Sequence, residues 1–427
     1  MKILWVKSGG LLPLDTGGKI RSFQLAKELA QRHEVTLFTF YPEHPSDRHP
    51  ELEQVFSRVV LLPMKLRPRA SFGDCINYAR NLFSGRPHAM TKYCRPEVAR
   101  RLREHLRQEE YDIIICDFLL TAAVIPWDVA CPKVIFTHNV EAVIWRRHFE
   151  VSKNPLWKAI SWREYRTMDT MERSYLRQAD HVLTVSEADR QTFSEFLDPS
   201  KITVIQTGVD TEYFRPTPAP EEPHSFVFTG SMDWLPNEDG IFYFADQILP
   251  LVRREIPDAT LTVVGRTPSE RLLALARRDS RIKITGRVDD VRPYIGQAAV
   301  YIVPLRIGGG TRIKIFEAMA MGKSVLSTSV GAEGLPVTHG RNILLADTPA
   351  MFADRAILLL NSQKTRETLG QAARALVEQH YSWGSVALGF EKVFHNLVAG
   401  PVSNDAEYEY LREMPPENGV ARTRAAG

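Results

Sequence analysis

The chain has 427 residues, of which 44% are hydrophobic and 25% are charged, and its formal net charge at pH 7 is +3. The length allows two or three domains with sizeable cores, and the composition is ordinary for a soluble globular protein. The small net charge argues against nucleic-acid binding, and no run approaches the ~18 consecutive apolar residues that a membrane span needs. The N-terminus leads directly into a strand without a cleavable apolar segment, so we expect a cytoplasmic protein.

Short apolar strands alternate with helices in the first half of the chain. A helix is predicted from about Lys19 to Arg32, with an apolar stripe that includes Leu25 and Leu29. Strands are predicted at Ile3–Lys7, Val35–Phe40, Val59–Pro63, Ile113–Asp117, Val134–Thr137 and His181–Val185. This alternation is typical of a parallel, doubly wound sheet.

The second half repeats the pattern after a proline-rich linker. The segment 215–225, RPTPAPEEPHS, contains four prolines and has no periodicity. Further strands are predicted at Phe226–Gly230, Thr260–Gly265, Ile282–Gly286, Val300–Leu305, Ser324–Ser327 and Ile343–Leu345. We therefore predict an α/β protein of two Rossmann-like domains facing each other across a cleft, with ligands at the carboxyl ends of the strands.

The four cysteines lie scattered in the first third of the chain, without the spacing of metal ligands. They are Cys75, Cys94, Cys116 and Cys131. Reduced, structural thiols fit this pattern best, so we expect neither a zinc site nor a disulfide. No other cluster with metal-ligand spacing is visible.

The segment PLRIGGGTRIKIFEAMAMG, residues 304–322, predicts an anion site at the start of a helix. A strand over residues 299–305 runs into three glycines: Gly308, Gly309 and Gly310. Thr311 is the expected N-cap, Arg312 and Lys314 lie in the first turn, and Gly322 ends the helix. Glycines allow close approach of the backbone, and the free N–H groups of the first turn attract an anion. A phosphate is the expected ligand.

Glu317 lies one turn further along this predicted helix. It shares a face with Ile313, Ala320 and Met321, so its carboxylate should be half buried among apolar groups. A buried charge needs a partner, and the vicinal hydroxyls of a ribose would supply two hydrogen bonds. A glutamate that reaches water or pairs with an arginine is the equal alternative. The helix thus indicates a nucleotide, with its phosphate at the helix start and its sugar ring at the second turn.

These features resemble those of glycosyltransferase family 4, retaining enzymes with the GT-B fold that use nucleotide sugars. The similarity runs from Lys2 to about Val398 and rests on the order of several phrases: DTGGKIRSFQLAKELA, THNVE, HVLTVSEAD, GVDTEYFRP, FTGSMDWLPNEDG, ATLTVVGR, ITGRVDDVRPYI and GGGTRIKIFEAMAMGKSVLSTSVGAEGL. The resemblance implies an acceptor-side domain over 1–200, a donor-binding domain over 201–380 with a linker at about 209–225, and a helix at 381–400 that returns to the first domain. The polar tail 401–427 is expected to be disordered.

The resemblance assigns roles to residues of the first domain. Gly17 and Gly18 match the glycine loop where the backbone approaches the donor phosphates and the acceptor, although a plain tight turn would give the same pattern. His138 matches the histidine that contacts the transferred sugar, and it directly follows a predicted buried strand. Asn139 and Glu141 are candidates to orient His138, and Glu141 could equally cap the next helix.

In the second domain, Glu317 matches the second glutamate of the family's paired-glutamate motif, which holds the ribose. With His138 it forms our pair of catalytic candidates. Arg287 lies near the expected base pocket, and a surface arginine in a turn is the equal alternative. Ser231 and Asp233 follow the first strand of this domain and could line the phosphate end of the donor.

Two departures from the family pattern concern the donor phosphates. The first glutamate of the pair should lie eight residues before Glu317, where the chain has Gly309. The family's Arg–Lys pair normally follows the turn at Gly230, where SMDWLPNED contains no cation. We hypothesise that Arg312 or Lys314 replaces the missing charge, and that the glycine loop before them contacts the donor sugar through backbone N–H groups.

We expect transfer of a hexose from a UDP- or GDP-linked sugar, with retention at the anomeric carbon and without a metal or other cofactor. The acceptor would be a glycan or a lipid-linked molecule, in polysaccharide or cell-envelope glycan synthesis. From Arg58 to Arg103 there are eleven Lys or Arg and two Asp or Glu, with interleaved aromatics. This region favours peripheral contact with the inner face of the cell membrane, with a solvated basic face as the equal alternative. The segment Trp157–Arg177 has a similar composition but is better interpreted as a long packing helix.

Other functions stay open. A catalytically silent sugar-nucleotide-binding protein would fit Gly309 and the missing Arg–Lys pair, and turnover with any donor would eliminate it. A GT-B sugar-nucleotide epimerase would change the donor without an acceptor, but the matched phrases argue against it. An NAD-dependent dehydrogenase fits less well, because the loop SGGLLPLDTGG lacks the compact glycine spacing of a dinucleotide fingerprint.

Overall fold

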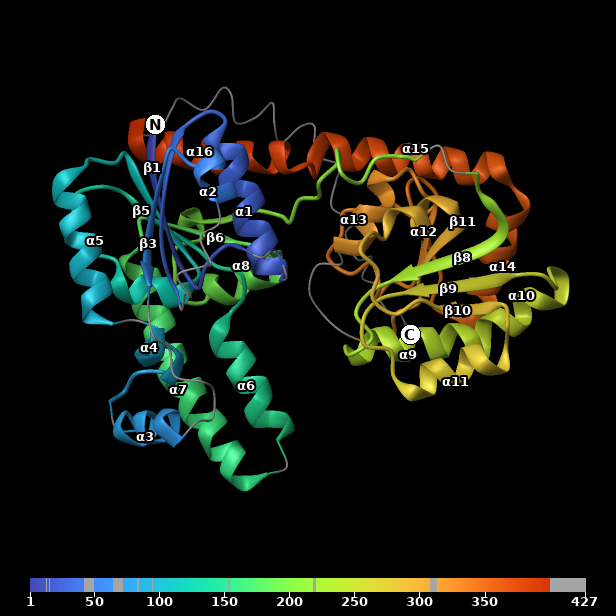
Figure 1. Ribbon diagram of the computed structural model, residues 1–427, viewed down its shortest axis with the longest axis horizontal. Helices are drawn as coiled ribbons and strands as arrows, with labels where there is room; N and C mark the ends of the chain where they lie inside the picture. Colours follow the sequence, from blue (N-terminus) through green and yellow to red (C-terminus); the bar gives the residue numbers. More distant parts are fainter. Residues whose placement is uncertain are drawn as a thin grey trace, which may run out of the picture. The chain divides into compact units, whose positions relative to one another are not determined.

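The structure, a computed structural model, describes residues 1–12, 14, 16–41, 50–63, 72–82, 84–93, 95–152, 154–217, 220–307 and 313–399. The chain divides into two compact units, Met1–Thr207 with Val386–Pro401 and Gly208–Ser385 (Figure 1). The tail predicted to be disordered lies outside the described residues. None of the described helices combines the length and the hydropathy required to cross a membrane.

A seven-stranded parallel sheet forms the first unit, in the order β3-β2-β1-β4-β5-β6-β7. Its strands are β1 (Lys2–Ser8), β2 (Glu34–Tyr41), β3 (Arg58–Pro63), β4 (Ile113–Asp117), β5 (Lys133–Phe136), β6 (His181–Thr184) and β7 (Ile202–Val204). The order reverses between β1 and β4, so the predicted doubly wound sheet is confirmed. Strand β7 is absent from the predicted strands because three residues are too few to show a pattern. It lies just beyond the predicted domain boundary at residue 200.

The helices of the first unit pack on its sheet or extend away from it, and the last helix of the chain packs on the sheet (Figure 1). They are α1 (Gly17–Ala30), α2 (Pro50–Val55), α3 (Phe72–Arg80), α4 (His88–Tyr93), α5 (Pro96–Gln108), α6 (Glu141–Val151), α7 (Pro155–Gln178), α8 (Glu187–Ser194) and α16 (Trp383–Ala399), with short turns η1 (Leu119–Val124) and η2 (Pro199–Lys201). Helix α1 begins before the predicted Lys19 because Thr16 Oγ1 accepts a hydrogen bond from the backbone N–H of Lys19, which caps the helix. In α16, the Phe390 ring stacks on Trp5 with 6.2 Å between centroids.

The second unit contains a six-stranded parallel sheet in the order β10-β9-β8-β11-β12-β13. Its strands are β8 (Glu222–Thr229), β9 (Thr260–Val264), β10 (Ile282–Ile284), β11 (Ala298–Val303), β12 (Val325–Ser327) and β13 (Leu344–Leu345). The end of the predicted linker 209–225 needs correction, because Glu222–Ser225 begin β8 and Ser225 pairs with Thr260 of β9.

The helices of the second unit lie on both faces of its sheet. They are α9 (Leu235–Tyr243), η3 (Phe244–Ile248), α10 (Leu249–Glu255), α11 (Glu270–Arg278), α12 (Arg292–Gln297), α13 (Ile313–Ala320), α14 (Pro349–Asn361) and α15 (Gln363–His380). Helices α9, α10 and α11 lie on one side, and α12, α13 and α15 on the other (Figure 1). Helix α13 ends before Gly322, as predicted.

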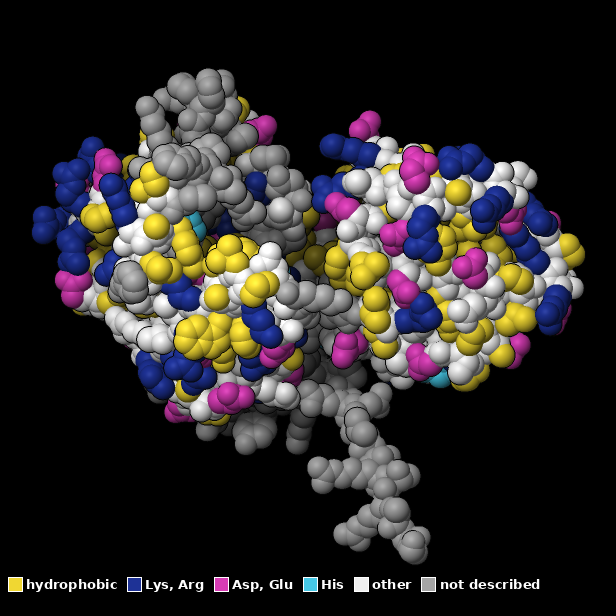
Figure 2. Space-filling model, turned by 90° about the horizontal axis from the view of Figure 1, so that it is seen from below, with side chains coloured by type: hydrophobic (Ala, Val, Ile, Leu, Met, Phe, Trp, Pro, Cys, Tyr) yellow, Lys and Arg dark blue, Asp and Glu magenta, His cyan; other side chains and the backbone are white. Residues whose placement is uncertain are grey.

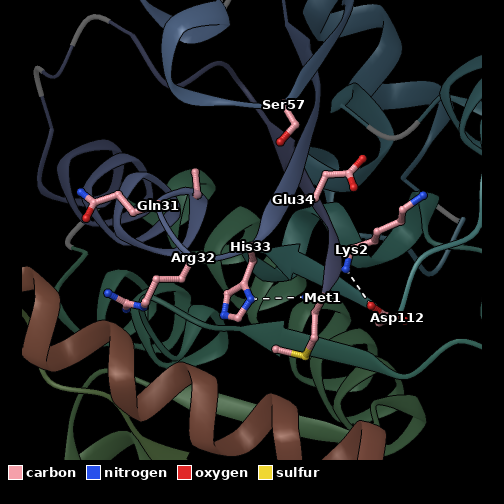
Figure 3. A pocket seen from close by; sticks show the side chains of 9 residues that line it. Met1, Lys2, Gln31, Arg32, His33, Glu34, Ser57 and Asp112 are labelled. Atoms are coloured by element: carbon pink, nitrogen blue, oxygen red, sulfur yellow. Dashed lines mark hydrogen bonds between the residues drawn. The ribbon is translucent and has the colours of Figure 1, made fainter.

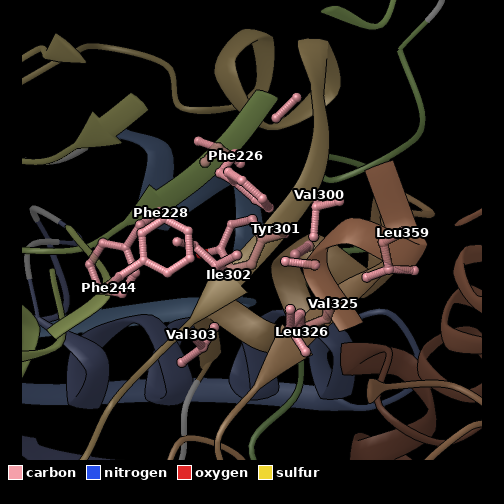
Figure 4. Close-up of a cluster of buried hydrophobic side chains, with 14 of the residues drawn as sticks. Phe226, Phe228, Phe244, Val300, Tyr301, Ile302, Val303, Val325, Leu326 and Leu359 are labelled. Carbon is pink, nitrogen blue, oxygen red and sulfur yellow. The ribbon is translucent and has the colours of Figure 1, made fainter. Parts of the chain in front are cut away.

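The core of the second unit is packed from apolar strands (Figure 4). Phe226 and Phe228 of β8 are fully buried, as are Tyr301 and Ile302 of β11. Phe244 lies edge-on to Phe226, with 5.2 Å between ring centroids. Strands that are buried on both faces appear in a sequence as nearly continuous apolar runs, which explains why most observed strands lie close to the predicted ranges.

Candidate functional site

Charged side chains of the first unit meet at the carboxyl ends of neighbouring strands. Lys7 of β1 is the register partner of Asp117, the last residue of β4. His138 lies two residues beyond β5, the strand on the other side of β4. Lys7 Nζ lies 3.1 Å from Asp117 Oδ2, and all three side chains are buried. The parallel sheet therefore gathers a cation, an anion and an imidazole at the edge where ligands of such sheets bind.

The ring of His138 is held by hydrogen bonds on both sides. Its Nδ1 lies 3.0 Å from Nη1 of Arg21, and its Nε2 lies 2.7 Å from Oδ1 of Asp117. A guanidinium can only donate, so Nδ1 accepts and Nε2 carries the proton that it donates to Asp117. Burial lowers the pKa of His138 to about 4, despite the opposing effect of Asp117. The ring is therefore neutral, and its tautomer is fixed by its neighbours.

Asp117 collects several donors. Besides His138, the indole Nε1–H of Trp5 donates to Oδ2 at 3.0 Å, and Lys7 forms the ion pair. Burial alone would raise the pKa of Asp117, but Lys7 and His138 hold this pKa well below its usual range. Burial lowers the pKa of Lys7, although Asp117 opposes that shift. The carboxylate is therefore charged and fully engaged, and it orients His138.

The candidates proposed to orient His138 need correction. The ring is bonded by Arg21 and Asp117, whereas Glu141 begins α6. Glu141 does not cap this helix either, because Glu172 of α7 accepts hydrogen bonds from the backbone N–H groups of Glu141 and Ala142. Neither Arg21 nor Asp117 was predicted from the sequence as a partner of the His138 ring. The sequence did contain one indication of a charged site: the predicted strands Ile3–Lys7 and Ile113–Asp117 end on residues of opposite charge.

Phe118 links His138 to the predicted glycine loop. Its ring stacks on His138, with 3.8 Å between centroids and 9° between planes, and its φ of 70° is rare for a residue with a side chain. A Cβ on Gly18 would lie 2.6 Å from Phe118 Cζ, so only glycine fits there without a shift. Gly17, the first residue of α1, has open space in the same direction. Gly18 thus permits close packing against the ring that covers His138.

We expect Gly18→Ala to destabilise the fold by about 1–3 kcal/mol, because the added methyl group must displace the Phe118 ring. Gly17→Ala is the matched control, since a Cβ at Gly17 meets no atom within 4 Å. Denaturant unfolding of both variants measures the difference. Equal stability would show that the ring does not pack tightly on Gly18.

In the second unit, a lysine lies at the turn that follows β8. Lys314 Nζ of α13 donates to Asn237 Oδ1 at 2.8 Å and lies 4.1 Å from the centroid of the Phe228 ring. A Cβ on Gly230 would lie 2.5 Å from Lys314 Nζ, so the glycine makes room for the ammonium group. The structure therefore places Lys314 where the turn itself carries no cation. Arg312, the other hypothesised replacement, lies outside the described residues.

A second cation, two residues beyond β9, reaches the same turn. Nε of Arg266 donates to Oγ of Ser231 at 2.8 Å, and Ser231 in turn hydrogen-bonds Asp233. The backbone carbonyl of Ser231 accepts a hydrogen bond from Nδ2 of Asn237 at 2.8 Å. Asn237 therefore connects Ser231 to Lys314. Neither Arg266 nor Asn237 was predicted from the sequence. The available signal for Arg266 was a cation just past the carboxyl end of an apolar strand.

Glu317 lies one helical turn beyond Lys314, on the predicted face of α13. Ala320 and Met321 on that face are buried, and the Glu317 side chain itself is half buried. Burial raises the pKa of Glu317 to about 7, although Lys314 opposes this shift. Among the described residues, no side chain or backbone group hydrogen-bonds the carboxyl group. It is therefore available to a ligand.

The remaining predicted residues are placed less closely or lie outside the description. Arg287 is exposed after β10, and no hydrogen bond or ion pair joins it to a described residue. The predicted phosphate loop falls outside the described residues: Gly308, Gly309, Gly310, Thr311 and Arg312.

A separate cavity of about 560 Å³ lies at the opposite edge of the first sheet (Figure 3). It is lined by the first residues of β1 and β2 and by Asp112, which precedes β4. Asp112 accepts a hydrogen bond from the backbone N–H of Lys2 at 2.7 Å. Because ligands of parallel sheets bind at the carboxyl ends of the strands, this cavity is not our candidate site.

Known proteins resemble the chain along most of its length. A protein of Klebsiella pneumoniae described as an uncharacterized 44.6 kDa protein in the cps region is 21% identical over 393 residues, which cover 89% of this chain and 96% of that protein. A GDP-mannose-dependent alpha-(1-6)-phosphatidylinositol monomannoside mannosyltransferase of Mycobacterium tuberculosis is 26% identical over 250 residues, 52% of this chain and 64% of that enzyme. The structure of Anabaena HepE in complex with UDP and glucose matches with a TM-score of 0.61 and 16% identity, over 93% of this chain and 100% of HepE.

Family models match both units. The model described as Glycosyltransferase Family 4 matches residues 16–213, and the model described as Glycosyl transferases group 1 matches residues 223–362. The first range includes Arg21, Asp117 and His138, and the second includes Lys314 and Glu317. The chain thus belongs to glycosyltransferase family 4, and it is a glycosyltransferase with the GT-B fold.

Proposed function

We propose that this glycosyltransferase moves a hexose from a nucleoside-diphosphate sugar to a glycan or a lipid-linked acceptor, with retention of anomeric configuration. One observation carries the donor assignment. Glu317 offers a half-buried carboxyl group without a described partner, one turn from Lys314 at the Gly230 turn. A carboxylate and a cation at this spacing suit the ribose hydroxyls and the diphosphate of one nucleotide.

The cations of the second unit would serve the departing diphosphate. Its negative charge grows as the sugar–phosphate bond breaks, and fixed cations and N–H groups stabilise it. Lys314 is positioned by Asn237, and Arg266 by Ser231, so both are oriented before the donor binds. These charges support transfer without a metal ion, and we propose that no cofactor is needed. We expect activity to be unchanged by a metal chelator.

In the first unit, His138 is the proposed contact of the transferred sugar. Neither ring nitrogen is available as a general base, because Arg21 and Asp117 occupy both. The neutral ring would instead shape the sugar site together with Phe118, which stacks on it. Retaining transfer would then leave the acceptor proton to a departing phosphate oxygen.

The donor base, UDP or GDP, is supported by relatives of both kinds. The mycobacterial relative is named for GDP-mannose, and HepE is described with UDP. The location of the Klebsiella relative in a cps region supports a role in polysaccharide or cell-envelope glycan synthesis. Cytoplasmic placement, with peripheral contact at the inner membrane face, suits a lipid-linked acceptor. Part of the basic region 58–103 is neutralised, since Arg58 pairs with Glu109 and Arg103 with Asp128.

Glu317→Gln is expected to lower nucleotide affinity by about tenfold to a hundredfold, because hydrogen bonds to a charged acceptor contribute most.

The same variant should be more stable than the wild type at about pH 8. The pKa of Glu317 rises from 4.5 to about 7 on folding, so this group favours the folded state below pH 4.5, and the advantage is lost as pH rises to 7. Above that value the folded protein must bury a charge that glutamine lacks.

Thermal unfolding at about pH 5 and about pH 8, with nucleotide titration of both proteins, checks these expectations. The difference in melting temperature should be small at the lower pH and larger at the higher pH. Unchanged affinity in Glu317→Gln would remove the ribose assignment.

A turnover assay separates transfer from the silent sugar-nucleotide-binding protein that Gly309 and the missing Arg–Lys pair favour. Nuclear magnetic resonance of the product reports the anomeric configuration. An inverted product would contradict retention. Donor that changes configuration at another carbon without an acceptor would indicate an epimerase. Nucleotide binding without turnover over a range of glycan and lipid-linked acceptors would favour the silent protein.

A further inference from the structure

Helices α6 and α7 form a hairpin that extends from the first sheet, with α3 and α4 beside α7 (Figure 1). Arg163 of α7 donates to the backbone carbonyls of Asn81 and Leu82, at 2.6 and 3.0 Å. Glu164 accepts a hydrogen bond from the backbone N–H of His88 at 2.8 Å. The two residues that follow α3 and the first residue of α4 are therefore hydrogen-bonded to α7, and they share a surface with the hairpin.

Large apolar side chains are exposed on this surface. The exposed fraction is 70% for Leu156, 52% for Trp162, 44% for Trp157 and 41% for Leu82. Trp157 is held in place by Trp145 of α6, with 6.3 Å between ring centroids. Figure 2, which views the molecule from the hairpin end, shows hydrophobic side chains gathered on the first unit beside Lys and Arg side chains. Exposed apolar patches of this kind mark interaction sites.

Cations accompany the tryptophans. Lys158 and Arg166 lie four residues before and after Trp162, so all three share one exposed stripe of α7. Neither cation forms an ion pair with a described residue, and Lys158 Nζ lies 5.2 Å from the centroid of the Phe149 ring. The nearby acids are already engaged: Glu150 pairs with Arg146, and Glu164 is buried against Arg163. The stripe therefore carries uncompensated positive charge.

We propose that this hairpin patch (Leu82, Leu156, Trp157, Lys158, Trp162 and Arg166) docks the enzyme on an anionic lipid surface. Tryptophan rings prefer the boundary between headgroups and acyl chains, and Lys and Arg beside them attract anionic headgroups. An acidic lipid leaflet complements both the exposed indoles and the unpaired cations. This docking goes beyond the proposed transfer, and its cations are Lys158 and Arg166 of α7, whereas the sequence favoured the cations of the basic region 58–103.

Vesicle flotation of the full chain, without nucleotide or acceptor, tests the proposal. We expect the wild type to float with phosphatidylcholine vesicles that contain about 30% phosphatidylglycerol, and to float weakly with pure phosphatidylcholine. Raising the salt from about 0.1 M to about 1 M should release the electrostatic part of the binding. Wild-type protein that stays unbound to the anionic vesicles would overturn the proposal, whatever its nucleotide binding.

Two patch variants and a control locate the contact. Lys158→Glu/Arg166→Glu and Trp162→Ala should each partition at least about tenfold more weakly than the wild type. Arg254→Glu/Lys364→Glu, which reverses two exposed charges on the second unit, should float like the wild type. Thermal melts and nucleotide titrations confirm that each variant is folded. Equal flotation of the patch variants and the control would overturn the proposal, as would a wild-type oligomer that the patch variants dissociate.

Discussion

Lys314→Met is expected to lower kcat/KM by about 10²–10³, the usual cost of removing one fixed group that stabilises charge in the transition state. The reason is its position. Lys314 Nζ is fixed by Asn237 at 2.8 Å beside the Gly230 turn, whose own segment SMDWLPNED contains no lysine or arginine. Methionine keeps most of the stem over the Phe228 ring and removes only the charge. Steady-state kinetics with the donor measures the effect.

The matched control is Lys364→Met, which removes an exposed lysine from α15 of the same unit. It should leave kcat/KM within about twofold of the wild-type value, because exposed charges contribute little at a distance. Affinity for the nucleoside without phosphates should be equal in the wild type and in Lys314→Met. A variant with normal kcat/KM would show that Lys314 does not meet the leaving group.

Asp117→Asn is expected to destabilise the protein by about 3–5 kcal/mol, the usual cost of removing one partner of a buried ion pair. Donors from Trp5, Lys7 and His138 converge on the two carboxylate oxygens of Asp117. An asparagine offers one oxygen and places an NH₂ group against the remaining donors. Lys7 would stay buried without a counter-charge. Denaturant unfolding near neutral pH measures the loss.

The double variant Asp117→Asn/Lys7→Met is the control, because it removes both charges. It should recover part of the lost stability, since a buried cation no longer lacks a partner. Its activity should stay low, because the imidazole of His138 loses the acceptor that fixes its tautomer. Additive losses in the two single variants and the double variant would contradict the ion pair.

The fold was predictable because its signals are local. Strands such as Ile113–Asp117 are buried on both faces, so the apolar run itself gives their bounds. The inward face of α13, with Glu317 beside Ala320, follows from helical spacing alone. Such local signals did not predict strand β7 or the start of β8. Strand β7 has only three residues, and β8 begins with Glu222–Pro223, so neither shows an apolar run long enough to mark a strand.

The polar network of the first unit was not predictable, because its partners lie far apart in the chain. Arg21 reads as an ordinary helical cation, yet its side chain hydrogen-bonds Thr207, which is 186 residues away, as well as His138. In the sequence, Asp117 is only the last residue of a predicted strand. Its contacts with Lys7 and His138 depend on the sheet order, which places β4 between β1 and β5. Lys314 was identified from its motif, but its arrival at Gly230 depends on how α13 packs against β8.

The most direct test of the donor site is calorimetric titration of the wild-type protein with UDP, GDP and their sugar derivatives, with Glu317→Gln and Lys314→Met in parallel. A ligand at a hundredfold excess over its dissociation constant stabilises the folded state by about 2.7 kcal/mol. Shifts in melting temperature can therefore show which nucleotide base the protein binds before the calorimetric titrations are made. We expect one nucleotide to bind the wild type, and both variants to bind it more weakly. Binding of equal strength in all three proteins, or in none, would contradict a donor site built on Lys314 and Glu317.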